Sequence, residues 1–289
     1  MSTKTEERGL DQEMEDFAFH LRYPSAPERG KRRPKGDSTV GTYVYIVRRF
    51  HGFLSGQAPD ENMAMAYIRH LEEIGNVPRS RAQAIYGLRA YFEFRGEEFG
   101  IGAPSFSKPL PWRPTDDEWI RLLEVAEAPL WDPALPQRAK TRALFHRAAL
   151  MVYGGAGLRL AEGCAMKKSD LFLAGSDLDP RALLEVKGKG GTVNRIPVED
   201  AVAFAIQEWG ASHDSEWVFP GRGGNHIHRR TMQATILALM KKAGIQNVHR
   251  AVHALRHTMG AQLRKAGADI RDIQQVLRHA DISTTQIYT

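Results

Sequence analysis

The chain has 289 residues, of which 42% are hydrophobic and 26% are charged, a composition typical of one large or two ordinary soluble globular domains. The longest uncharged run, residues 148–158, is too short and too rich in glycine to span a bilayer, and the N-terminal residues lack the apolar core of a signal peptide. Cys164 is the only cysteine, which excludes an internal disulfide framework and suits a reducing compartment. We therefore expect a cytoplasmic protein that does not associate with membranes.

The net charge of +6 and the isoelectric point near 9.4 favour a polyanionic partner. Nucleic acid is a better candidate than an anionic membrane surface, because we find no basic amphipathic helix with an aromatic apolar face. Charge alone does not decide between a nucleic-acid partner and none.

The first third of the chain shows the apolar periodicity of helices. Residues 1–10 are charged and predict no regular element, whereas residues 10–22 carry apolar side chains at helical spacing. A second helix is predicted after residues 37–39, which offer N-cap side chains, and two more over 62–74 and 80–94. These segments predict a small helical bundle with one basic face.

Two groups of basic residues in this third are either solvated or in contact with phosphate groups. One group lies in the turn-rich stretch 30–36, and the other lies on or near the helix predicted over 80–94. Lys and Arg side chains gathered on one surface are what a nucleic-acid backbone attracts. The candidate contacts are Lys31, Arg32, Arg33, Lys35, Arg79, Arg81 and Arg89.

Residues 104–114 contain four prolines, which neither a helix interior nor a central strand tolerates. We interpret this stretch as a stiff interdomain linker. Thr115 and Glu118 have the spacing of a capping box and predict the start of a helix. The predicted division is a helical domain over 1–103, a linker over 104–114 and a second domain over 115–289.

The second domain combines helices with one β region. Short apolar runs within 183–198 flank the basic, glycine-rich turn 187–191, and this pattern predicts a hairpin or a three-stranded sheet. The other predicted elements are helices over 142–153, 199–209, 231–243, 252–266, 269–277 and 283–288. The predicted fold class is mainly α with a small antiparallel β-sheet.

Several side chains of the second domain have the chemistry that metal-free attack on a phosphodiester requires. The transition state concentrates negative charge on the nonbridging oxygens, which guanidinium groups neutralise with paired hydrogen bonds. The leaving oxygen needs a proton from a positioned acid, and a nucleophilic phenol, whose ordinary pKa is about 10, needs help to ionise. Arg159, Lys189, Arg256 and Tyr288 offer these groups, together with several histidines.

The order of these residues resembles the signature of the tyrosine recombinases, the family of phage integrases, Cre and the Xer proteins. The compactness of the chain makes it resemble the Xer subgroup most. Residues 157–162, Gly-Leu-Arg-Leu-Ala-Glu, resemble the first arginine box, and residues 188–190, Gly-Lys-Gly, resemble the β-turn lysine motif. Residues 253–257, His-Ala-Leu-Arg-His, resemble the second arginine box, and Tyr288 follows His279 by the usual nine residues. The resemblance covers the second domain and, more weakly, residues 37–100. It implies that the catalytic residues are Arg159, Lys189, His253, Arg256, His279 and Tyr288.

The resemblance also implies a mechanism. Arg159 and Arg256 would bind the scissile phosphate while the oxygen of Tyr288 attacks phosphorus to form a 3′-phosphotyrosine. Lys189 would protonate the leaving 5′ oxygen, and a 5′-hydroxyl of a partner strand would then reverse the step. Because bond energy stays in the covalent link, neither ATP nor a metal is implied, and we expect no cofactor.

Histidines and neighbouring charges would assist. By the resemblance, His279 donates a further hydrogen bond to the phosphate, and His253 helps to deprotonate the nucleophile. His257 and Glu162 are interpreted as supporting residues, and Lys187 as a contact to the DNA backbone.

Three positions depart from the family pattern. Arg278 stands where glycine is usual, so we expect the preceding helix to end without a left-handed glycine and Arg278 to add a phosphate contact. Ala161 replaces a common serine, a minor loss. The chain ends one residue after Tyr288, where relatives usually continue with a short tail that docks on a neighbouring subunit. We expect the cleavage chemistry to persist and assembly to be affected.

The implied partners are double-stranded DNA recombination sites, bound by a homotetramer or by a heterotetramer with a related recombinase. Two alternatives stay open: a nicking-and-rejoining enzyme that relaxes DNA, and a non-catalytic DNA-binding protein with the same fold. The host process, chromosome or plasmid resolution or the integration of a mobile element, also stays open. Although His253 and His257 have the spacing of a zinc pair, Ala254 stands where a metalloprotease needs glutamate, so we expect no metal site.

Overall fold

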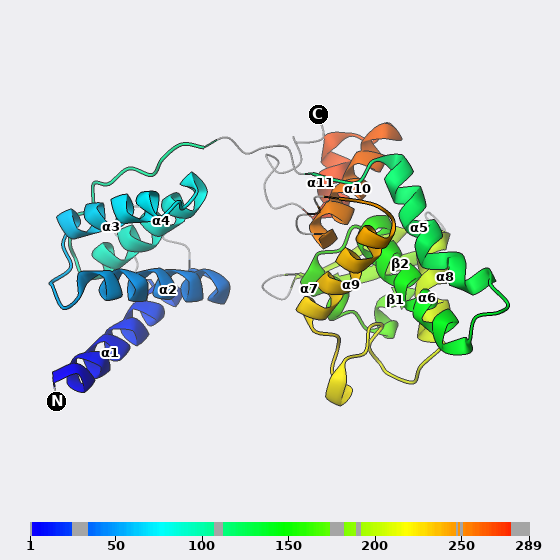
Figure 1. Cartoon of the computed structure of the whole chain (residues 1–289), viewed down its shortest axis with the longest axis horizontal. Helices are drawn as coiled ribbons and strands as arrows, with labels where there is room; N and C mark the ends of the chain where they lie inside the picture. The colour runs from blue at the N-terminus through cyan, green and yellow to red at the C-terminus, as the bar shows by residue number, and fades with distance from the viewer. Residues whose placement is uncertain are drawn as a thin grey trace. The chain divides into compact units, whose positions relative to one another are not determined.

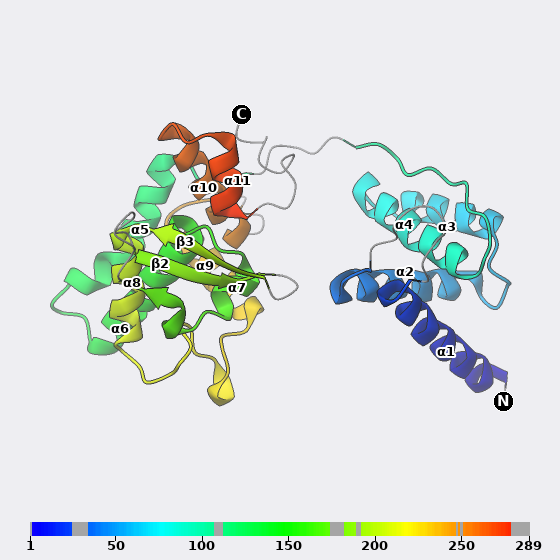
Figure 2. The ribbon, with the colours of Figure 1, turned by 180° about the vertical axis from the view of Figure 1, so that it is seen from behind.

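The computed structural model of the chain describes residues 2–24, 34–106, 112–173, 182–188, 192–246, 248 and 251–278, with side chains described from residue 9 onward. The chain divides into two compact units, residues 1–108 and 109–289. Helices dominate both units, and unit 2 also contains a three-stranded antiparallel sheet (Figures 1 and 2). This architecture confirms the predicted fold class. Among the described residues, no helix combines the length and apolar character needed to cross a membrane.

Unit 1 consists of four helices that share one apolar core. They are α1 (Ser2–Arg22), α2 (Asp37–Leu54), α3 (Glu61–Glu73) and α4 (Pro78–Phe94). A polar network runs through this core: the Tyr91 hydroxyl on α4 donates to Glu13 Oε1 on α1 at 2.6 Å and lies 2.8 Å from His51 Nε2 on α2. Three helices are therefore joined at one buried phenol, whose pKa is raised by burial and by the bond to Glu13.

Two details of unit 1 differ from the sequence prediction. Helix α1 begins at Ser2 rather than near Leu10, because the Lys, Glu and Arg residues before Leu10 are good helix formers. Helix α2 has Gly36 as its N-cap, without a side-chain cap, so residues 37–39 lie inside the first turn. Asp37 pairs there with Arg22 of α1 at 3.0 Å and so closes the connection between the two helices.

Unit 2 begins with the predicted capping box: Thr115 Oγ1 accepts from the Glu118 N–H at 3.2 Å, and Glu118 Oε2 accepts from the Thr115 N–H at 2.8 Å. Its helices are α5 (Asp116–Trp131), α6 (Gln137–Leu150), α7 (Leu160–Cys164), α8 (Asp200–Gly210), α9 (Arg229–Lys242), α10 (Ala251–Lys265) and α11 (Ile270–Leu277). Helix α6 continues into a π-helical turn, Met151–Gly155.

The sheet of unit 2 has the strand order β1 (Leu171–Phe172), β2 (Ala182–Lys187), β3 (Val193–Val198). Strands β2 and β3 pair antiparallel, with Leu184 opposite Ile196 and Lys187 opposite Val193. Buried apolar side chains alternate with less buried side chains along β2, as expected for a sheet with one face against the core. The pairing confirms the predicted hairpin, although residues 189–191 of its turn lie outside the described residues.

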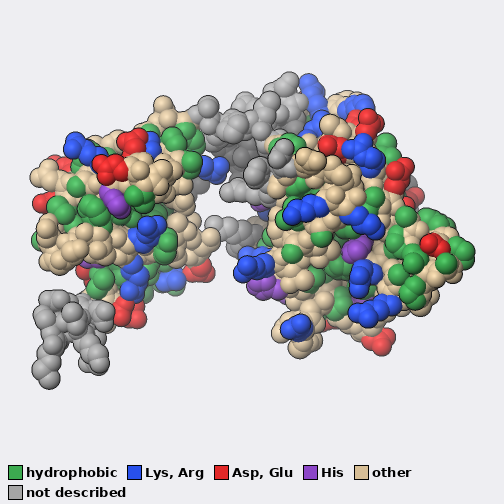
Figure 3. All heavy atoms as spheres, viewed as in Figure 1, with side chains coloured by type: hydrophobic (Ala, Val, Ile, Leu, Met, Phe, Trp, Pro, Cys, Tyr) green, Lys and Arg blue, Asp and Glu red, His purple; other side chains and the backbone are tan. Residues whose placement is uncertain are grey.

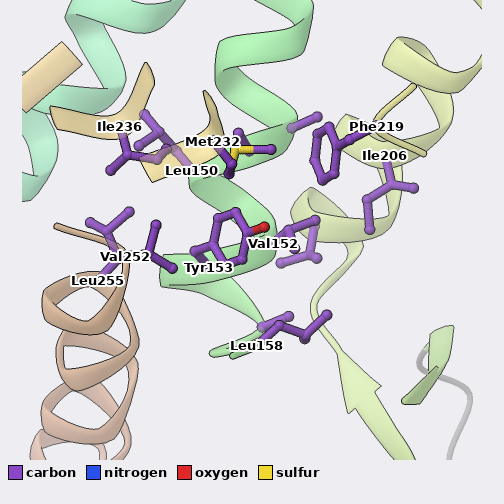
Figure 4. Close-up of a cluster of buried hydrophobic side chains, with 14 of the residues drawn as sticks. Leu150, Val152, Tyr153, Leu158, Ile206, Phe219, Met232, Ile236, Val252 and Leu255 are labelled. Atoms are coloured by element: carbon purple, nitrogen blue, oxygen red, sulfur yellow. The ribbon is translucent and has the colours of Figure 1, made fainter. Parts of the chain in front are cut away.

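The core of unit 2 surrounds Tyr153, which lies in the π-helical turn (Figure 4). Leu150 and Val252 pack in the same cluster, so the turn is fixed against α10. The Tyr153 hydroxyl lies 3.6 Å from the sulfur of Cys164, and burial raises the pKa of that thiol. Cys164 is therefore a packed core residue.

The close approach of Gly163 to the Tyr153 ring generates a stability prediction. A Cβ added at Gly163 would lie 2.5 Å from Tyr153 Cε1, so Gly163→Ala is expected to destabilise unit 2 by about 1–3 kcal/mol through overpacking. Urea unfolding followed by tryptophan fluorescence measures this directly, because all five tryptophans lie in unit 2. In the matched control Gly210→Ala, the new Cβ meets nothing closer than 3.6 Å. Equal stability of the two variants would contradict the packing argument.

Candidate active site

The segment between the π-helical turn and α7 brings Arg159 to the end of α11. Gly157 has a φ of +64°, and a Cβ there would lie 2.9 Å from Leu277 Cδ2. Only glycine combines this backbone conformation with so close an approach to α11. Arg159 follows in extended conformation as the N-cap of α7. The glycine of the first arginine box thus determines where its arginine lies.

Helix α10 carries His253, Arg256 and His257 at positions i, i+3 and i+4, which lie on one side of a helix. Arg256 is only 4% exposed. Its Nη1 donates to the carbonyl oxygen of Gly157, and its Nη2 donates to the carbonyl oxygen of Leu277. Arg256 therefore joins α10 to the first arginine box and to the end of α11.

The two arginine boxes meet at the C-terminal end of α11. Arg159 Nη2 donates to the carbonyl oxygen of Arg278 at 2.5 Å, while Arg256 Nη2 donates to that of Leu277. Because these carbonyls belong to consecutive residues, the two guanidinium groups are neighbours. The last carbonyls of a helix lack partners within the helix and carry partial negative charge, so they are suitable acceptors for cations.

Glu162 on α7 orients Arg159. Its Oε1 accepts from Arg159 Nη1 at 2.7 Å, and its Oε2 accepts from the Arg159 backbone N–H at 2.8 Å. The Glu162 side chain is 7% exposed, whereas the Arg159 side chain is 39% exposed. Burial alone would raise the pKa of Glu162, but the charge of Arg278 and the bonds from Arg159 outweigh it and lower the pKa. A buried, ionised carboxylate thus holds a guanidinium that solvent reaches.

The two histidines of α10 differ in environment. His253 is exposed, whereas His257 is partly buried. Burial, reinforced by the positive charges of His253 and Arg256, lowers the pKa of His257 to about 4. His257 is therefore a neutral imidazole beside Arg256 at neutral pH. No group of three His, Cys, Asp or Glu side chains in the described part of the chain is arranged to hold a metal ion.

A cavity of 790 Å³ opens beside Arg159 and extends to the β2–β3 hairpin. Arg159, Glu162 and Lys187 are among the residues that line it. Lys187 Nζ lies 3.2 Å from Oδ1 of Asp170, a buried carboxylate that precedes β1. The hairpin lysine that the sequence favours, Lys189, lies outside the described residues, as do His279 and Tyr288.

Helix α11 ends without a left-handed glycine, as the sequence predicted. Arg278 adopts the left-handed conformation itself, with φ 52° and ψ 45°, as the C-cap of α11. This conformation costs a side chain with a Cβ on the order of 1 kcal/mol. Its guanidinium is buried and donates to Glu162 Oε2 at 2.8 Å, so in this structure it pairs with a carboxylate rather than facing solvent for a phosphate contact.

Of the candidate DNA contacts in unit 1, Lys35, Arg79 and Arg89 are exposed, and Arg81 is half-buried. Arg81 pairs with Glu72 at 2.8 Å, and Arg89 Nη2 donates to the Ile101 carbonyl at 2.8 Å. Both arginines therefore stabilise unit 1 itself. Lys31, Arg32 and Arg33 lie outside the described residues. In unit 2, Lys and Arg side chains appear at several places on the face seen in Figure 3, with His side chains near some of them.

Sequence reasoning did not find two parts of this arrangement. The carbonyls of Leu277 and Arg278 are backbone groups, which leave no trace in residue identity. The pair formed by Glu162 and Arg278 had a weak signal, because an arginine replaced an expected glycine and a buried guanidinium needs hydrogen-bond acceptors, among which a carboxylate is a strong one.

Comparison with known proteins identifies the family. A model of the phage integrase family matches residues 115–289. The tyrosine recombinase XerC of Xanthomonas axonopodis pv. citri is 39% identical over 195 residues, which cover 65% of this chain and 57% of that protein. The tyrosine recombinase XerA of Thermococcus kodakarensis is 33% identical over 264 residues, which cover 88% of this chain and 85% of that protein.

Solved structures share the fold. The XerH site-specific recombinase, bound to its difH substrate in a pre-cleavage complex, matches with a TM-score of 0.71 at 17% identity, over 97% of this chain and 92% of that one. Residues 75–356 of lambda integrase, in a dimer bound to a core site, match with a TM-score of 0.68 at 16% identity, over 96% of this chain and 95% of that one. Since the family model covers more than half of the chain and the Thermococcus relative aligns over most of it, this chain belongs to the phage integrase family and is an Xer-like, site-specific tyrosine recombinase, an enzyme that cleaves and rejoins DNA.

Proposed function

We propose that Arg159 and Arg256 bind the scissile phosphate of a DNA recombination site and that Tyr288 is the nucleophile. The observation that supports this most strongly is the meeting of two guanidinium groups from distant segments at consecutive carbonyls of α11. From that helix end the chain continues directly to His279 and then to Tyr288. A phosphate held by both arginines would therefore lie next to Arg278, the residue after which the segment that carries the proposed nucleophile begins.

The proposed reaction is a pair of transesterifications. The Tyr288 oxygen attacks phosphorus, the bond to the 5′ oxygen breaks, and the proton of the phenol passes to His253. Lys189 gives a proton to the leaving 5′ oxygen, and His279 donates to a nonbridging oxygen. A 5′-hydroxyl of a partner strand then attacks the 3′-phosphotyrosine and releases Tyr288. The two arginines stabilise the charge that develops on phosphorus, and removal of one such donor typically costs roughly 3 kcal/mol of barrier.

We infer that unit 1 binds the DNA backbone through Lys31, Arg32, Arg33, Lys35 and Arg79, with Arg81 and Arg89 as further contacts. Lys187 of unit 2 is a further proposed contact to the backbone. The basic net charge supports this, as does the presence of DNA in the complexes of XerH and lambda integrase. Strand exchange between two sites requires four protomers, so the proposed assembly is a tetramer on DNA. It forms from identical chains or with a related recombinase, in chromosome or plasmid resolution or in the integration of a mobile element.

The proposed nucleophile is tested by trapping the covalent intermediate. The substrate is a nicked duplex whose site has been selected from a randomised DNA library by binding to the wild-type protein. Wild type is expected to form a protein–DNA adduct that resists denaturation, and Tyr288→Phe to form none, because the phenol oxygen is lost. Tyr23→Phe, at an exposed tyrosine of unit 1, is the matched control and should form the adduct normally.

An adduct with Tyr288→Phe would contradict the assignment. On a plasmid with two such sites, relaxation without recombinant product would contradict strand exchange and favour a nicking-and-rejoining enzyme.

The role of Lys189 is tested with a leaving group that needs no proton. Lys189→Ala is expected to slow cleavage of the ordinary substrate roughly 100-fold or more, and to cleave a substrate with a 5′-bridging sulfur nearly as fast as wild type, because a thiolate leaves unprotonated. Lys187→Ala is the matched control, and any loss of rate should be equal for both substrates. If the substrate with the 5′-bridging sulfur restored the rate of Lys187→Ala but not that of Lys189→Ala, the general acid would be Lys187.

His257 is proposed to support Arg256 as a neutral imidazole, which generates a pH prediction. The pKa of His257 is about 4 in the folded chain and about 6.5 when unfolded. Between these values the unfolded state binds more protons, so the stability of unit 2 is retained above pH 6.5 and falls as the pH drops towards 4. In His257→Asn, the free energy of unfolding should depend less steeply on pH, by an amount that corresponds to the uptake of at most one proton on unfolding. Urea unfolding followed by tryptophan fluorescence at several pH values measures this dependence. An unchanged pH dependence would contradict the buried neutral form.

A further inference from the structure

The buried guanidinium of Arg278 is poorly explained as a device for stability. Arg278 occupies a left-handed conformation that favours glycine, and its side chain is only 7% exposed. Its Nε is buried without a hydrogen-bond partner in the described part of the chain. Burial lowers the pKa of Arg278 despite the neighbouring Glu162, which shows that the site opposes the charge. Strained backbone together with a buried charge is typical of functional sites.

The contacts of Arg278 lead to Arg159 by two routes. Through its side chain, Arg278 Nη2 donates to Glu162 Oε2 at 2.8 Å, and the same carboxylate accepts from Arg159 Nη1 and from the Arg159 backbone N–H. Through its backbone, the Arg278 carbonyl accepts from Arg159 Nη2 at 2.5 Å. Arg278 thus fixes both acceptors that determine where the Arg159 guanidinium points.

We propose that Arg278 is a positioning residue for Arg159. The Arg278 guanidinium donates a hydrogen bond to Oε2 of Glu162. The carboxylate therefore cannot rotate so that both of its oxygens accept hydrogen bonds from the Arg159 guanidinium. Arg159 Nη2 then bonds only to a neutral carbonyl, a weaker acceptor that a phosphate oxygen readily replaces. The same ion pair fastens the end of α11 to α7. This inference rests on the proposed role of Arg159 in binding phosphate.

The test separates positioning from stability. In Arg278→Gly the left-handed strain disappears, so the melting temperature of unit 2, followed by tryptophan fluorescence, should not fall by more than about 2 °C. DNA affinity measured by gel shift should stay within about twofold, because the Arg278 side chain is only 7% exposed and its charge is paired with Glu162. Single-turnover adduct formation at saturating protein should slow roughly 10-fold or more, since small misplacements of a catalytic group have effects of this size.

Two further variants examine the route through Glu162. Arg278→Lys keeps the charge and should recover part of the lost rate. In a Glu162→Gln background, Arg278→Gly should slow cleavage by no more than about twofold further, because the carboxylate that transmits its effect is already gone. Ser55→Gly is the matched backbone control: Ser55 is the other described non-glycine residue with positive φ, at 50° and at the end of α2. It should leave cleavage unchanged.

The outcomes distinguish this inference from the proposed function. If wild type forms no adduct, or if Arg159→Ala cleaves as fast as wild type, the proposed function fails. If Arg159→Ala is inactive but Arg278→Gly cleaves at the wild-type rate, only the positioning role is overturned. Parallel loss of melting temperature, DNA affinity and rate in Arg278→Gly would show that Arg278 is a structural residue.

Discussion

Two backbone carbonyls at the end of α11 hold the candidate site together. They belong to Leu277 and Arg278, and each accepts from one of the two arginines that the sequence motifs single out. The last carbonyls of a helix have no hydrogen-bond partners within the helix. The end of α11 can therefore accept hydrogen bonds from arginines at the start of α7 and on α10. At this helix end the guanidinium groups of both Arg159 and Arg256 find acceptors.

The surroundings of these carbonyls contain more positive than negative charge. Among the described residues, three arginines meet there with one carboxylate, Glu162, and the histidines of α10 lie close by. Like charges in a desolvated site disfavour the folded state unless an anion joins them. A phosphate group would supply the missing negative charge, so the same imbalance that lowers stability favours binding of the phosphodiester. The neutral form of His257 limits the imbalance at neutral pH.

Core packing and site geometry depend on the same segment. The π-helical turn 151–155 anchors Tyr153 in the core of unit 2, and the chain then passes Gly157 and reaches Arg159. Because the turn is packed against α10, the positions of Arg159 and Arg256 are coupled through the core. π-Helical turns interrupt the regular hydrogen-bond pattern of a helix and are frequent at functional sites. Here the interruption ends α6 and redirects the chain towards α11.

The sequence by itself determined the mainly helical fold with its β2–β3 hairpin, the capping box at Thr115 and the arginine boxes, because periodicity, capping and motif spacing are local properties of a chain. It also indicated that Arg278 was unusual. Only the tertiary structure decided what Arg278 does, since its partner Glu162 is distant in sequence and its left-handed backbone shows only in coordinates. The meeting of Arg159 and Arg256 at successive carbonyls was likewise decided by packing, because backbone acceptors are the same in every residue and become specific only where the fold leaves them without partners.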